Sequence, residues 1–280
     1  MKLSIVLSTH SAKFEAVAFK GDFEANVAKI AGWGYDGVEL AIRDPSLVDA
    51  DELERVVLSH GLQVPAIGTG QAWGEEGLSF TSDDPDVRAA AIERIKSHVP
   101  LASRFNAIII LGLIRGITPE GQTHEQSMAY LVEALQDCAA VAARTGVRFA
   151  LEPLNRYETD LIHTVADGLD LIDRVGAENF GLLLDTFHMN VEEPVIEESI
   201  HACGDRIFHF HVADSNRWYP GAGHLDFVSI LGALVRQPDA LSATGYQGFV
   251  SGEFMPQPDA DISAERSIAY LRQTVLPRLA

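Results

Sequence analysis

The sequence predicts a single (β/α)₈ barrel over residues 1–280, and two features of the chain support this fold. Short β-rich apolar runs alternate with longer amphipathic segments from end to end, as in βα units around a parallel sheet. The runs recur roughly every 30 residues, and barrels of this kind take roughly 250 residues. No proline- or serine-rich linker divides the chain, so we expect one domain.

We expect the barrel strands in the short apolar runs. The turn after the first run, Ser8-Thr9-His10-Ser11, lacks the glycines that a dinucleotide-binding open sheet would carry there. A closed barrel is therefore favoured over an open, doubly wound sheet. The expected strands cover residues 3–8, 37–40, 64–67, 107–111, 147–152, 181–185, 207–211 and 248–253.

The amphipathic segments between these runs predict outer helices. In the clearest of them, apolar residues return every three or four positions. Gly61 and Gly146 follow two of these segments, where glycine can adopt the left-handed conformation that ends a helix. The segments cover residues 22–31, 51–60, 86–104 and 125–145.

Composition argues against several classes of partner and location. Hydrophobic residues make up 47% and charged residues 22% of the chain, which is typical of folded globular proteins. The net charge of -19 and the lack of any Lys/Arg run argue against binding to nucleic acid or anionic membranes. Cys138 and Cys203 are far apart in sequence, and no export signal or membrane-spanning run is evident. We therefore expect a cytoplasmic protein.

Polar side chains close the last four predicted strands. In such barrels the active site forms at the C-terminal ends of the strands. One carboxylate there is often a helix cap or a surface residue, but three gathered in a low-dielectric site would repel one another without a cation. Three carboxylates and an imidazole suit Mn²⁺, Mg²⁺ or Co²⁺ better than a tetrahedral zinc centre, and ligand softness alone does not name the metal. The expected ligands are Glu152, Asp185, His211 and Glu253.

Two further side chains lie near these residues in sequence. His188 follows Asp185 by about one helical turn, and Arg217 follows His211. Alone, the histidine could be a core or capping residue and the arginine a surface ion-pair partner. Beside a metal, both could donate to the substrate oxygen on which charge develops.

The segments around these residues resemble the ketose 3-epimerases. This group includes D-tagatose 3-epimerase and lies within the xylose isomerase-like barrel superfamily. The resemblance covers almost the whole chain and is carried by residues 152–158 (EPLNRYE), 184–190 (LDTFHMN), 209–217 (HFHVADSNR) and 248–253 (GFVSGE). It implies one Mn²⁺-type ion on the four expected ligands, with Glu152 and Glu253 doubling as acid/base groups. It also implies substrate contacts from Glu158, His188 and Arg217.

Within this superfamily the chain most resembles a branch described as 5-keto-L-gluconate epimerase. Residues 41–45 (AIRDP), 67–72 (IGTGQA) and 111–116 (LGLIRG) carry that resemblance. Two of these segments place Arg43 and Arg115 just after the second and fourth strands, where a guanidinium could bind a substrate carboxylate. The alternative is that each arginine pairs with a local acid such as Asp44 or Glu120.

We therefore predict an epimerase that inverts the carbon next to the ketone of a sugar or keto-sugar acid through a cis-enediolate. One carboxylate would remove the proton and the other would return one to the opposite face. The preferred substrate is predicted to be a keto acid of the 5-keto-L-gluconate or D-tagaturonate type. A neutral ketose 3-epimerase or an aldose–ketose isomerase remains the alternative, and the chain could form a homo-oligomer.

Three other functions fit the sequence less well. A dehydratase would use the same constellation but lose hydroxide. A multi-zinc phosphodiesterase like the apurinic endonucleases would need more histidines and a basic DNA-binding face, which the charge of -19 opposes. A catalytically dead sugar-binding barrel would have no use for a second carboxylate such as Glu253.

Overall fold

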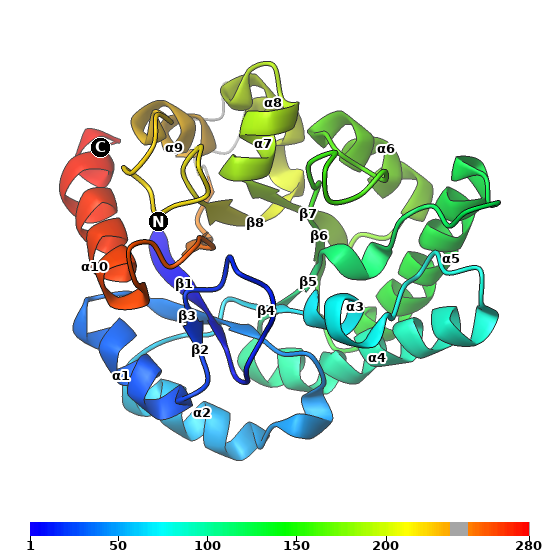
Figure 1. Ribbon diagram of the computed structural model, residues 1–280, viewed down its shortest axis with the longest axis horizontal. Helices are drawn as coiled ribbons and strands as arrows, with labels where there is room; N and C mark the ends of the chain where they lie inside the picture. Colours follow the sequence, from blue (N-terminus) through cyan, green and yellow to red (C-terminus); the bar gives the residue numbers. More distant parts are fainter. Residues whose placement is uncertain (236–245, 280) are drawn as a thin grey trace.

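A closed parallel barrel forms the centre of the computed structural model, which describes residues 1–235 and 246–279 (Figure 1). The strands hydrogen-bond in the order β2-β1-β3-β4-β5-β6-β7-β8-β9, and β9 pairs back onto β1, which closes the barrel. The two-residue β2 adds to the C-terminal end of β1 only. The strands are β1 (Lys2–Ser8), β2 (Phe19–Lys20), β3 (Gly37–Ala41), β4 (Ala66–Gly68), β5 (Ile108–Leu111), β6 (Phe149–Leu151), β7 (Phe180–Asp185), β8 (Ile207–Val212) and β9 (Phe249–Gly252).

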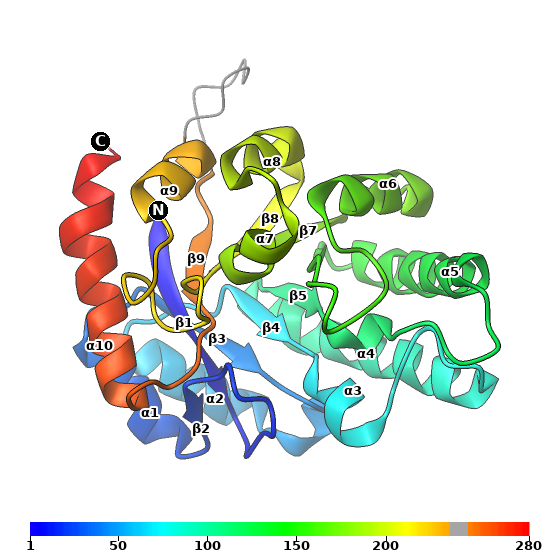
Figure 2. The same ribbon diagram turned by 45° about the horizontal axis from the view of Figure 1, so that its top comes forward.

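Helices surround the barrel (Figure 1). Helix α10 lies beside α1 (Figure 2), where Lys29 Nζ and Asp261 Oδ2 form an ion pair of 2.8 Å. Among the described residues, no helix has both the length and the apolar character needed to cross a membrane. The helices are α1 (Phe23–Gly32), α2 (Ala50–Ser59), α3 (Gln71–Glu76), α4 (Pro85–Phe105), α5 (His124–Ala143), α6 (Val165–Val175), α7 (Thr186–Glu192), α8 (Ile196–Cys203), α9 (Phe227–Val235) and α10 (Ala260–Tyr270).

Local sequence sets the ends of these helices. Asp49 and Thr123 accept hydrogen bonds from the first free backbone N–H groups of α2 and α5. Thr164 forms a reciprocal capping box at the start of α6. Gly61 and Gly146 have φ values of 71° and 72°, so both predicted helix-ending glycines adopt the left-handed conformation.

Strand alternation decides which side chains point into the barrel. Successive side chains of a strand point to opposite faces. A small apolar cluster inside the barrel contains Ala150 of β6 and Leu183 of β7, whereas their neighbours Leu151 and Leu184 pack in the larger outer core. Residues two positions further along share the inward face, which places Glu152 and Asp185 at the C-terminal mouth.

The barrel prediction is therefore confirmed. The eight barrel strands differ from the predicted ranges only at their ends, and the two-residue β2 is an addition that was not predicted. The largest differences are at β4 and β6, which begin two residues later than expected. Glu152 and Glu253 lie one residue beyond β6 and β9. Both glutamates therefore belong to the loops that form the mouth.

Candidate active site

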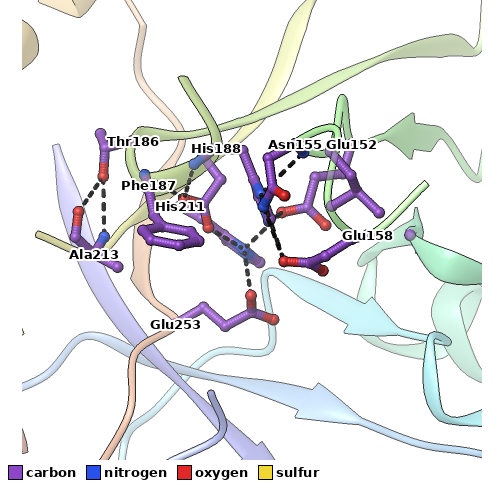
Figure 3. Close-up of polar contacts among 12 residues, drawn as sticks. Glu152, Asn155, Glu158, Thr186, Phe187, His188, His211, Ala213 and Glu253 are labelled. Atoms are coloured by element: carbon purple, nitrogen blue, oxygen red, sulfur yellow. Dashed lines mark hydrogen bonds and ion pairs between the residues drawn. The ribbon is translucent and has the colours of Figure 1, made fainter. Parts of the chain in front are cut away.

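Four polar side chains from the ends of β6, β7, β8 and β9 converge at the mouth of the barrel. His211 Nδ1 lies 3.9 Å from Glu152 Oε1, 3.8 Å from Asp185 Oδ2 and 3.9 Å from Glu253 Oε2. Figure 3 shows His211 between the two glutamates. One ligand atom from each of the four residues lies within 4.8 Å of the others, so together they could hold one metal ion.

Unpartnered atoms in this cluster fit a bound cation. Glu152 Oε1, Asp185 Oδ2 and His211 Nδ1 are buried and have no hydrogen-bond partner among the described residues. Leaving such atoms unpaired is costly, and all three face the same point. The two carboxylate oxygens of Asp185 have different roles. Oδ1 accepts a 2.7 Å hydrogen bond from the Phe187 N–H and caps α7. Its Oδ2 is left to face His211.

The electrostatics of the cluster also favour a cation. Burial, followed by the charge of Glu253, raises the pKa of Glu152 well above its usual value. Burial raises the pKa of Glu253 to about 7, although His211 and Arg217 oppose the shift. Burial likewise raises the pKa of Asp185. The raised pKa values show that the ionised forms of the three carboxylates are unfavourable when they lie this close together. A divalent ion among them would stabilise these ionised forms.

His188 presents a neutral donor to the site. Its Nδ1 accepts hydrogen bonds from the Asn155 backbone N–H at 3.3 Å and from the Asn155 side-chain Nδ2 at 2.8 Å. Burial and the charge of Arg217 lower the pKa of His188 well below its usual value. The single proton of the neutral ring therefore lies on Nε2, which is 3.7 Å from Glu152 Oε1.

Arg217 links two acids of the site. Its Nη1 donates to Glu158 Oε1 at 2.8 Å, and its Nη2 lies 3.5 Å from Glu253 Oε2. The guanidinium lies 4.8 Å from the centre of the Phe187 ring. Its backbone has a φ of 59°, the left-handed region that non-glycine residues adopt rarely. The arginine thus holds Glu158 and Glu253 in fixed positions beside the cavity.

A cavity of about 270 Å³ lies against these groups. Its polar side contains both candidate proton carriers, Glu152 and Glu253, together with His188, His211 and Arg217. Its other side is mainly apolar and includes Val6, Phe14, Ala41, Gly68, Trp73 and Ile110. A small molecule with one polar and one less polar face would fit such a site.

The predicted role of Arg115 needs correction. Its side chain is fully buried and is absent from the cavity lining. The 3₁₀ turn Leu113–Arg115 directs the guanidinium back beneath the strand ends, where it donates to backbone carbonyls, including those of Gly112 at 3.0 Å and Glu152. Arg115 therefore stabilises the backbone around Glu152 and does not face a substrate.

Arg43 also has partners other than a substrate. Its Nη1 lies 2.8 Å from Glu75 Oε2 and its Nε lies 3.0 Å from Glu76 Oε1, both at α3. Asp44 and Glu120, the acids suggested by the sequence, are not its partners. Arg43 does pair with acids of the protein, however, as the alternative predicted. The Arg43 side chain is also absent from the cavity lining.

Glu39 and His209 also belong to this site, although neither was predicted from the sequence. Glu39 lies on β3 and is 1% exposed, and it accepts hydrogen bonds from the Nε2 atoms of His209 and His211. Burial lowers the pKa of His211, but the charge of Glu39 reverses this and raises it to about 10. The available signal was a single acid within the otherwise apolar strand Gly37–Ala41.

Comparison with known proteins agrees with this geometry. A family model described as a xylose isomerase-like TIM barrel matches residues 27–274. The chain belongs to this family. It is 33% identical over 279 residues to the L-ribulose 3-epimerase of Methylomonas sp. (strain DH-1), covering 92% of this chain and 95% of that protein.

Other ketose 3-epimerases of the family are also similar. The chain is 31% identical over 269 residues to the L-ribulose 3-epimerase of Mesorhizobium japonicum (strain LMG 29417 / CECT 9101 / MAFF 303099), covering 95% of this chain and 86% of that protein. A crystal structure of D-allulose 3-epimerase from Methylomonas sp. with D-allulose matches with a TM-score of 0.79 and 26% identity over 97% of each chain. This member of the family is therefore a sugar epimerase of the ketose 3-epimerase group, an enzyme of the isomerase class, as the sequence predicted.

Proposed function

We propose that this enzyme inverts the carbon next to the ketone of a free ketose, using Glu152 and Glu253 as its two proton carriers. The supporting observation is that Glu152, which is buried, and Glu253, whose side chain is 14% exposed, flank His211 at the mouth of one cavity, and that burial raises the pKa of both. A carboxyl group with a pKa near 7 can both accept and donate a proton at neutral pH.

Each polar group has a distinct part in the proposed reaction. One glutamate removes the proton from the carbon next to the ketone, and the other returns a proton to the opposite face. His188 donates its Nε2–H to the oxygen that gains charge, and Arg217 keeps Glu253 and Glu158 in position. A divalent ion on the four ligands, for which we propose Mn²⁺ with Mg²⁺ or Co²⁺ as alternatives, would polarise the ketone.

The substrate that we propose is a neutral ketose. Because Arg43 and Arg115 already have other partners, neither is free to bind a substrate carboxylate. Among the described residues, the rest of the cavity lining is mainly apolar and holds one cation, Lys13, whose backbone N–H donates to Glu75 Oε1 at 3.3 Å. A keto acid of the 5-keto-L-gluconate or D-tagaturonate type is the second candidate, and Lys13, an exposed cation in the cavity lining, would be its partner.

A substrate panel tests this proposal. The Mn²⁺-loaded enzyme is incubated with D-fructose, D-tagatose and L-ribulose, and separately with 5-keto-L-gluconate and D-tagaturonate, and NMR identifies the products. We expect an epimer at the carbon next to the ketone and a higher kcat/KM for a neutral ketose. Faster turnover of the keto acids, with this preference lost in Lys13→Met, would support the second candidate. An aldose product would instead indicate an isomerase.

A further inference from the structure

A buried acid, Glu39, lies on the side of His211 that faces away from the proposed metal ligands. Both carboxylate oxygens of Glu39 lie 3.0 Å from His211 Nε2, and Glu39 Oε2 lies 2.7 Å from His209 Nε2. All three side chains are 1% exposed. The acid comes from β3, which lies across the barrel interior from β8.

This contact decides which nitrogen of His211 is available to a metal ion. An ionised carboxylate only accepts hydrogen bonds, so His211 must donate its Nε2–H to Glu39. In the neutral ring the lone pair is then on Nδ1. That atom lies 3.8–3.9 Å from the three carboxylates of the site. We infer that Glu39 is a positioning residue, which selects the tautomer and the ring orientation that let His211 coordinate the ion through Nδ1.

His209 strengthens the same arrangement. It precedes His211 by two residues on β8, so both rings point into the barrel from one face of the strand. Their ring centres are 5.3 Å apart in an edge-to-face contact. Glu39 accepts a hydrogen bond from each ring. If its side chain rotated away from His211, buried N–H groups of the rings would lose their acceptor, which is costly.

Glu39, His209 and His211 could instead bind an ion of their own, because their ligand atoms also lie within 4.8 Å of one another. The distances between Glu39 and the two rings, however, are those of ordinary hydrogen bonds. The number of ions bound per chain separates these two roles. The inference rests on the proposed metal site but does not depend on the sugar that is turned over.

The first test is the substitution Glu39→Gln, which keeps the volume of the side chain but cannot accept from both rings through two equivalent oxygens. We expect one Mn²⁺ per chain in the wild type, and a Kd for Mn²⁺ that is about 10- to 100-fold higher in the variant, measured by electron paramagnetic resonance of free Mn²⁺. Activity should return as the Mn²⁺ concentration is raised, with kcat close to that of the wild type.

Glu193→Gln is the matched control. The half-buried Glu193 carboxylate accepts hydrogen bonds from the Val165 N–H at 2.7 Å and the Ser199 hydroxyl at 2.6 Å, and it touches none of the proposed ligands. This variant also removes a carboxylate that accepts two hydrogen bonds. We expect its Kd for Mn²⁺ to equal that of the wild type.

A second test uses the wild-type protein alone, so its result does not depend on whether a variant folds. ¹⁵N NMR of the protein saturated with diamagnetic Mg²⁺ should show His211 as the Nε2–H tautomer with a metal-shifted Nδ1. The inference is wrong if His211 carries its proton on Nδ1, if folded Glu39→Gln binds Mn²⁺ as tightly as the wild type, or if the wild type binds two ions and the variant one. Failure of every sugar in the substrate panel would affect only the proposed function, because these tests contain no sugar.

Discussion

The two halves of the barrel mouth carry different kinds of side chain. Strands β6 to β9 lead to the acids and the imidazole of the proposed metal site. Strands β1, β3, β4 and β5 contribute Val6, Ala41, Gly68 and Ile110 to the opposite wall of the cavity. The first half therefore carries the groups for proton transfer, and the apolar residues of the second half set the shape of the space. Substitutions of the polar groups in the first half should change metal binding and kcat, and those of the apolar residues in the second should change KM. Glu39 of β3 is the exception in the second half, because it contacts His211.

The largest effect should come from removing one proton carrier. Glu152→Gln or Glu253→Gln keeps an oxygen for the metal but cannot accept or return the proton. We expect kcat to fall by about 10²–10⁴-fold, the usual contribution of general acid–base catalysis. Calorimetric titration with Mn²⁺ is the control for metal loading. Near wild-type turnover by either metal-loaded variant would exclude the two-carrier mechanism.

Metal affinity should depend on pH in a direction that the buried cluster determines. Without metal, His211 has a pKa of about 10 and Glu253 a pKa of about 7, so both hold protons at pH 6. Coordination requires their deprotonated forms, so lowering the pH must weaken binding. We expect a loss of roughly tenfold per pH unit for each displaced proton, with a steeper slope below about pH 7.

Calorimetry in buffers of different ionisation enthalpy would count the protons released when Mn²⁺ binds. More than one proton should be released at pH 6, and a smaller number at pH 8. An affinity that stays constant between these pH values would mean that neither His211 nor Glu253 loses a proton when Mn²⁺ binds, and it would contradict their role as ligands.

A smaller effect is expected on the apolar half. In Gly68→Ala the new methyl group would lie 3.9 Å from the Ala41 Cα atom, an ordinary contact, so the protein should fold normally. The methyl group takes space from the cavity, and we expect kcat/KM to fall roughly tenfold, mainly through KM. The Kd for Mn²⁺ should not change. A loss confined to kcat would show that the two halves are not separate in function.

The smallest effect on substrate choice is expected at Arg115. Arg115→Met would leave the buried carbonyl group of Glu152 without its guanidinium donor, so the free energy of unfolding should fall by about 1–3 kcal/mol or more. The ratio of kcat/KM for keto acids to that for neutral ketoses should stay constant. Thermal unfolding and the substrate panel together check this. A selective loss of keto-acid turnover would restore the role that the sequence suggested.

Residues that end a strand could be predicted from the sequence, whereas a partner within a distant strand could not. An apolar run that ends in Glu152 or Asp185 places that side chain at the mouth of any parallel barrel, so local pattern and fold class together predict the site. Glu39 escaped because it lies within a strand, and its partner His211 is 172 residues away in the chain. Only the register of the closed barrel brings the two together.

Arg115 shows a second limit of sequence reasoning. Its position after β5 was predicted correctly, but the direction of its side chain depends on the 3₁₀ turn that follows the strand. Guanidinium groups satisfy backbone carbonyls as readily as substrate carboxylates, and residue type alone does not distinguish these partners. The sequence therefore predicted that both arginines lie near the mouth, but not that Arg43 and Arg115 are absent from the cavity lining.

The most direct test of the central claim is solvent exchange at the inverted carbon. A neutral ketose accepted by the Mn²⁺-loaded enzyme is incubated in ²H₂O, and the early product and the remaining substrate are examined by NMR. Two proton carriers on opposite faces predict one deuterium at the inverted carbon of each product molecule, none at other carbons, and little in the recovered substrate. Product that forms without deuterium would mean that no proton passes through Glu152 and Glu253 to solvent, and it would contradict this account.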